Sequence, residues 1–122
     1  MKLLHLSFFF CCVISLQAQK TSVFAERTAE YERGLDLYDK GVYGAALTAF
    51  EKSSKIDAEL VEPKADLLSM KSQLMMSKSA VRIGKPDAEM VMLSFFRNNT
   101  PDALAYEAVM DLGNYYYAKK NY

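Results

Sequence analysis

The sequence predicts an all-α protein, and three observations carry this prediction. Apolar residues recur at spacings of three and four through most of the chain, as they do on one face of a helix. Glycines and prolines that end or open helices separate these segments, at Gly41, Gly84, Pro86 and Pro101. No Asn-Gly or Asp-Gly hairpin turn and no sustained apolar–polar alternation indicates a strand.

Residues 1–18 have the composition of a secretory signal peptide. Lys2 is followed by a nearly unbroken apolar run from Leu3 to Leu16, and the small residue Ala18 follows the run. The run is shorter than the roughly 20 residues of a membrane-spanning helix. We therefore expect cleavage after Ala18. A lipid-modified or uncleaved anchor at Cys11-Cys12 is the alternative, although no small residue precedes either cysteine.

Cleavage would remove most of the reactive chemistry, because His5, Cys11 and Cys12 are the only histidine and cysteines. Residues 19–122 then have no disulfide, thiol nucleophile, imidazole base or Cys or His metal ligand. Without Lys2 they carry 14 of the 15 basic residues against all 15 acidic ones, which gives no bulk attraction to nucleic acid. We expect a non-catalytic domain with no cofactor and no bound metal.

The first two helices are predicted to form a hairpin. The first begins at a Thr21 or Ser22 cap and ends at Gly41, since glycine tolerates the left-handed backbone of a helix terminus. Its apolar face comprises Phe24, Thr28, Tyr31, Leu35 and Tyr38. The second runs from Tyr43 to about Ile56.

Small residues in this hairpin are expected to lie where the two helices approach each other. Gly34 and Ala46 leave room for a close contact, and the ring of Phe50 fills the space beside them. Asp57–Lys64 is a predicted break, in which Pro63 stands just before or at the start of the next helix.

The third helix is predicted from Ala65 to Ile83 and is ended by Gly84. Two adjoining apolar stripes run along it: Leu67, Met70, Leu74, Val81 and Leu68, Met75, Met76, Ile83.

The last two helices are expected to open at prolines, because proline suits the first turn of a helix. Pro86 opens the fourth, and Pro101, after a Thr100 cap, opens the fifth. The fourth has the predicted buried face Ala88, Val91, Met92, Phe95 and Phe96, and the fifth carries Ala105, Tyr106, Val109, Met110, Gly113 and Tyr117.

Two segments carry a family resemblance. Residues 109–116, Val-Met-Asp-Leu-Gly-Asn-Tyr-Tyr, and Ala46-Leu-Thr-Ala-Phe50 resemble the two halves of a tetratricopeptide repeat (TPR), W-x2-L-G-x2-Y and A-x3-F. Gly34, Gly41 and Tyr43 stand where the family has its small residue and turn. The resemblance implies a helix-turn-helix solenoid of about two and a half repeats over residues 19–122, incomplete at the C-terminus. An unrelated small helical bundle is the alternative.

The TPR resemblance also implies a function. It implies an exported bacterial interaction scaffold, periplasmic or associated with the outer membrane, that holds a protein or peptide in a concave groove and has no membrane span after cleavage. The groove would be lined by Tyr31, Leu35, Tyr38, Asp39, Lys71, Leu74, Lys78, Arg82, Met110, Asn114 and Tyr117. The alternative is an assembly module that stacks on itself or on repeats beyond Tyr122.

Lysines recur every seven residues at Lys64, Lys71, Lys78 and Lys85, and this spacing predicts a ridge along one side. Flanked by tyrosines, this ridge would suit a peptide with acidic side chains or a free carboxylate. The alternative is that these lysines only keep the surface soluble.

Overall fold

The computed structural model describes residues 2–55 and 66–120, with side chains from residue 21 onward. Within these ranges the chain is all-helical and contains no strand, so the predicted fold class is confirmed. The helices are α1 (Lys2–Asp39), α2 (Tyr43–Ser54), α3 (Leu67–Arg82), α4 (Ala88–Asn99) and α5 (Ala103–Lys120).

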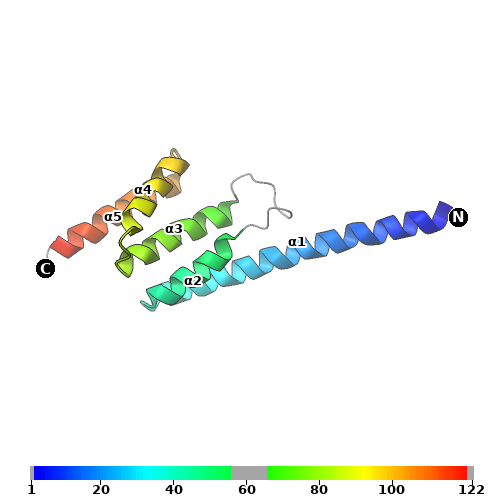
Figure 1. Cartoon of the computed structure of the whole chain (residues 1–122), viewed down its shortest axis with the longest axis horizontal. Helices are drawn as coiled ribbons and strands as arrows, with labels where there is room; N and C mark the ends of the chain where they lie inside the picture. The colour runs from blue at the N-terminus through cyan, green and yellow to red at the C-terminus, as the bar shows by residue number, and fades with distance from the viewer. Residues whose placement is uncertain (1, 56–65, 121–122) are drawn as a thin grey trace.

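Helix α3 is the centre of the packing. Each helix packs against the next one along the chain, and α3 also contacts α1 and α5. Helices α2 and α4 both lie against α3, but over their described residues their Cα atoms do not come within 8 Å of each other. The N-terminal half of α1 extends beyond the other helices (Figure 1).

The α1–α2 hairpin has the predicted turn and the predicted close contact. Gly41 adopts a φ of +77°, and the Val42 amide donates to Leu37 O, which closes the end of α1. Ala46 and Phe50 are fully buried. A Cβ atom added to Gly34 would lie 2.6 Å from Phe50 Cε1, so only glycine leaves room for the ring there.

Helix α1 does not begin at Thr21 or Ser22, and that prediction is wrong for the full-length chain. The helix runs without interruption from Lys2, because residues 19–22 include neither proline nor glycine to stop it. At the other end of the hairpin, α2 ends at Ser54. The predicted end at Ile56 and the Asp57–Lys64 break with Pro63 lie outside the described residues.

Aspartate side chains cap α3 and α5, and no described side chain caps α4. Asp66 caps α3, its Oδ1 accepting from the Leu68 amide at 3.1 Å. Pro86 precedes α4 by two residues and lies in the turn. Thr100 does not cap α5 but closes α4 by donating from Oγ1 to Phe96 O, while Asp102 accepts from the Leu104 amide at 2.8 Å.

Buried serines form the seam between α2 and α3. Ser53 and Ser72 are fully buried, and their Oγ atoms lie 2.9 Å apart. Ser72 also donates to Leu68 O, and Ser69 donates to Ser54 O. Small side chains allow a close approach, and their hydroxyls are satisfied locally.

Arg27 ties three helices together at one end of this seam. Its side chain is 6% exposed, and its Nε donates to Ser53 O at 2.8 Å. Its Nη2 lies 2.5 Å from Asp66 Oδ2, an ion pair that does not have hydrogen-bond geometry. Arg27 thus links α1 to the end of α2 and to the start of α3.

The larger apolar core lies between α3, α4 and α5. It includes Leu74, Val81, Met92, Phe95 and Leu112, all buried. The predicted α4 face is confirmed at Ala88, Met92 and Phe95, but Val91 is exposed. On α3, Leu67 and Ile83 are exposed near the two ends of the helix, while serines occupy much of its buried surface.

Candidate binding site

Several residues predicted for the groove meet on the surface formed by α1, α3 and α5, which we call the α1–α3–α5 face. Lys78 of α3 pairs with two carboxylates of α5: its Nζ lies 2.6 Å from Glu107 Oε1 and 2.5 Å from Asp111 Oδ2. Tyr31 of α1 is close enough for its pKa to respond to both Lys78 and Glu107. Three helices therefore share one polar network.

In this network the pKa values of Lys78 and Tyr31 are both raised. Burial lowers the pKa of Lys78, but the hydrogen bonds and charges of Asp111 and Glu107 outweigh it, so the pKa of Lys78 is raised. Burial raises the pKa of Tyr31, with a further contribution from the Glu107 charge that Lys78 opposes. At neutral pH Lys78 is thus a charged ammonium whose charge is already compensated.

Arg82 occupies the same face one turn further along α3. A side-chain hydrogen bond with Tyr38 raises the pKa of Arg82, and the guanidinium carbon lies 5.6 Å from the centre of the Tyr115 ring. The hollow beside these side chains has a volume of about 10 Å³, which holds no more than one water. This face is therefore filled by its own side chains.

The predicted groove residues divide into three sets. Tyr31, Leu35, Tyr38 and Arg82, with Lys78, lie on helices that meet at the α1–α3–α5 face, half-buried except for Arg82. Leu74 belongs to the core, at 2% exposure. Asp39 and Lys71 are exposed, as are Met110, Asn114 and Tyr117.

The groove residues predicted on α5 lie away from the face of the helix that packs on the core and on α3. Ala105, Ala108 and Leu112 turn toward the core, and a Cβ atom added to Gly113 would have no described neighbour within 4 Å. Glu107 and Asp111 face α3 instead of Met110 and Asn114. The lysine ridge is divided as well: Lys71 and Lys85 are exposed, Lys78 is paired, and Lys64 lies outside the described residues.

A groove that the sequence reasoning missed lies between α2, α3 and α4. It has a volume of about 470 Å³ and lies where α2 and α4 pack on α3 with their backbones apart. Its apolar lining comprises Leu47, Met76, Ala80, Val91 and Phe95. The exposure of Val91, which belongs to the apolar stripe of α4, is explained by this groove.

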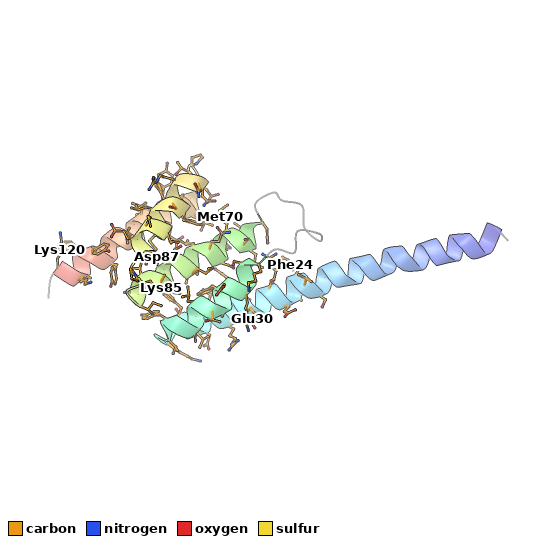
Figure 2. The ribbon with its side chains drawn as sticks, in the orientation of Figure 1. Phe24, Glu30, Met70, Lys85, Asp87 and Lys120 are labelled. Carbon is orange, nitrogen blue, oxygen red and sulfur yellow. The ribbon has the colours of Figure 1, made fainter. Side chains whose placement is uncertain are left out.

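Polar side chains surround the groove at its two ends. Gln73, Asn98 and Asn99 provide carboxamides near the end of α4. Lys85 and Asp87 lie at the α3–α4 turn, where Figure 2 labels both, and carry opposite charges. The groove therefore has an apolar lining, a hydrogen-bonding rim and no excess charge.

The described residues were also compared with the requirements of a metal site and of a membrane span. Within residues 2–55 and 66–120, no group of three or more His, Cys, Asp or Glu side chains is placed to hold a metal ion. No helix in this described part of the chain is long and apolar enough to cross a membrane. The volume of the groove between α2, α3 and α4 lies within the range of roughly 300–1,000 Å³ that is typical of ligand pockets.

Comparisons of the chain with protein-family models, curated proteins and solved structures give no match.

Proposed function

We propose that this chain is a non-catalytic binding module that holds an uncharged, apolar segment of a partner protein in the α2–α3–α4 groove. The observation that carries the proposal is the groove itself, an open apolar hollow of about 470 Å³ between two helices whose Cα atoms stay more than 8 Å apart. By contrast, the hollow on the α1–α3–α5 face is about 10 Å³.

The chemistry of the groove supports an apolar occupant. Leu47, Val91 and Phe95 offer apolar surface to inserted side chains. The side-chain NH2 group of Gln73 donates to Ser69 Oγ, and that of Asn99 donates to Phe95 O. These hydrogen bonds hold the two carboxamides in place, and with them the direction of their oxygens. Such oxygens can accept hydrogen bonds from the main chain of a bound peptide.

The charges argue against an acidic ligand at Lys78. An incoming carboxylate would have to displace Glu107 and Asp111, which already contact the ammonium. Lys71 and Arg82 are exposed, so binding of an acidic peptide is the alternative hypothesis. The experiment described next distinguishes the two.

Peptide arrays with apolar neutral, acidic and basic sequences would test the proposal. Val91→Glu places a charge in the groove lining, and Met90→Glu, also on an exposed α4 position, is the matched control. We expect apolar peptides to bind the wild type and the control but not Val91→Glu. Equal binding by both variants, or capture only of acidic peptides that depends on Lys71 and Lys78, would contradict the groove proposal.

We further infer that the helices form a TPR-like solenoid. Two successive helical hairpins, α1–α2 and α3–α4, are followed by α5, and α3 contacts both α1 and α5 as stacked repeats do. The contact of Gly34 with Phe50 of the Ala-x3-Phe segment also supports this inference. Determination of the helix packing by crystallography or NMR would test it, and an unstacked bundle would overturn it.

We also propose that the protein is exported to the bacterial cell envelope after cleavage near Ala18. The support is the charge and apolar pattern of residues 1–18. Mass spectrometry of the protein from its native cells is expected to give an N-terminus within a few residues of Gln19. An intact Met1, or a lipid on Cys11 or Cys12, would contradict export by this route.

A further inference from the structure

Helix α5 has a second apolar face that is largely exposed, although Tyr106 at its start also contacts the Phe96 ring of α4, with the ring centroids 5.7 Å apart. Its first face is buried through Ala105, Ala108 and Leu112. On the opposite side an exposed stripe follows the spacing of three and four residues: Tyr106, Val109, Met110, Gly113 and Tyr117. Met110 and Tyr117 are 67% and 73% exposed. A helix with apolar residues on both sides is typically packed on both sides.

Gly113 lies in the middle of this exposed stripe, which we call the α5 stripe. Glycine inside a helix costs about 1 kcal/mol relative to alanine and usually has a packing reason. At Gly34 the reason is visible, because the Phe50 ring occupies the space where a side chain would be. At Gly113 the corresponding space is open.

The α5 stripe is complementary to itself in size when two copies of α5 run antiparallel. If Met110 of one copy lies opposite Gly113 of the other, the two-fold symmetry repeats this contact with the copies exchanged. The same register places Tyr106 of each copy opposite Tyr117 of the other. Large side chains then meet the small one at the centre, and aromatic rings meet at both ends.

The charges on the stripe favour the same direction. Asp102, just before α5, and Lys120, at its end, are exposed and stand beyond the two ends of the stripe. The carboxylate of Asp102 also accepts from the Leu104 amide. The antiparallel register brings Lys120 of one copy next to Asp102 of the other, twice. A parallel pair would instead bring like charges together. Glu107 and Asp111, beside the stripe, are already paired with Lys78.

We propose that the α5 stripe is a two-fold interface through which two copies of this chain dimerise, with their α5 helices antiparallel. The interface lies on α5, away from the residues that line the α2–α3–α4 groove, and it does not depend on the groove having a ligand. Each α5 of 18 residues offers a contact about 27 Å long. Two modules would thereby present two grooves at once.

Sedimentation equilibrium of the full chain over a range of concentrations would test the proposal. We expect the wild-type mass to rise from one chain to two and no further. Met110→Glu and Gly113→Leu should weaken dimerisation by about tenfold or more. Met110→Glu would bury a charge in the interface, and Gly113→Leu would prevent the two α5 helices from approaching each other closely. Met90→Glu, on exposed α4, is the control and should dimerise like the wild type.

A second pair of variants tests the direction of the helices. Lys120→Glu should weaken the dimer, whereas Lys119→Glu should not, because Lys119 lies on the side of Tyr115, 5.9 Å from the centre of its ring. Circular dichroism would verify that all variants remain helical. A wild-type monomer, a mass that grows beyond two chains, or a dimer that survives both Met110→Glu and Gly113→Leu would overturn the proposal. Equal effects of the two lysine variants would overturn the antiparallel register.

Discussion

The two sides of α3 are packed by different means. On the side of α3 that faces α1 and α2, which we call the N-terminal side, glycine, alanine and serine and the Arg27–Asp66 ion pair make many of the contacts. Phe50 is the fully buried ring there, and Tyr31 packs against it. On the C-terminal side, toward α4 and α5, the contacts are large apolar side chains. The first side depends on close approach and satisfied polar groups, and the second depends on apolar area.

The buried surface of a helix therefore does not have to be apolar in order to pack closely against its neighbours. Three of the four buried serines of α3, Ser72, Ser77 and Ser79, donate to the carbonyls four residues earlier. These three hydroxyls therefore enter the interior with a hydrogen-bond acceptor already in their own helix, whereas Ser69 donates to Ser54 O of α2. Mutations should consequently have different costs on the two sides.

The largest effect is expected on the C-terminal side. Met92→Ala removes a fully buried side chain from the α3–α4–α5 core and should lower the free energy of unfolding by about 2–5 kcal/mol. Met90→Ala, on the exposed side of the same helix, should change it by no more than about 0.5 kcal/mol. Chemical denaturation would measure both, and equal midpoints would mean that this core does not hold the domain together.

On the N-terminal side the ion pair should give the largest effect. Arg27→Met leaves the Asp66 carboxylate without its cation and Ser53 O without its donor, and should cost about 3 kcal/mol. Adding Asp66→Asn should recover part of the loss, because asparagine retains the helix cap without a charge. A double-mutant cycle from denaturation curves would measure the coupling, and strict additivity would contradict it.

Gly34 and Gly113, both inside helices, should respond in opposite directions to the same change. Gly34→Ala places a methyl group against the Phe50 ring and should destabilise the protein by about 1–3 kcal/mol. Gly113→Ala meets open space and should stabilise the monomer by roughly 0.5–1 kcal/mol through helix propensity. Thermal unfolding at a concentration below dimerisation would compare them; a loss of stability in both would contradict the open space at Gly113.

A smaller and asymmetric effect is expected at the serine seam. Because Ser72 donates to Leu68 O, its oxygen accepts the hydrogen bond from Ser53. Ser72→Ala therefore strands the Ser53 donor and should cost about 1–2 kcal/mol, whereas Ser53→Ala removes only a donor and should cost about 0.5–1 kcal/mol. Denaturation midpoints in the reverse order would show that the hydroxyls are oriented differently.

The smallest effect concerns pH. The raised pKa values of Lys78 and Tyr31 mean that the folded state retains protons that the unfolded state has released. Their contribution to the free energy of unfolding is therefore complete at neutral pH. It is lost as the pH rises through and above about 10.4, where free lysine titrates. We would measure the urea midpoint of unfolding as a function of pH. In Lys78→Gln the midpoint should fall less steeply at alkaline pH than in the wild type. An unchanged slope would contradict the contribution of Lys78.

Local features of the fold could be predicted from the sequence. Gly41 and Gly84 both adopt positive φ values at the helix ends that they were expected to form. Ala46 and Phe50 are buried at the hairpin contact, as their spacing indicated. These predictions succeed because each depends only on residues within one helix or one turn.

The features that depend on distant partners could not be predicted. Helix α5 is apolar on two sides, so its periodicity did not select the face that packs on α3. A buried Arg27 makes sense only once Ser53 O and Asp66 are known to lie beside it. The groove is a consequence of α2 and α4 standing apart on α3, a spacing that no sequence pattern encodes.

The position of Arg27 has a consequence for how this protein can vary. By binding both Ser53 O and Asp66, it fixes the separation of the two chain ends that residues 56–65 must connect. The hairpins on either side then keep their relative placement whatever the length of the connection. Closing a longer connection costs only about 0.6 kcal/mol for each doubling of its length. This point between the two hairpins is therefore where the protein can best accept inserted sequence, such as an epitope, a label or an entire second domain.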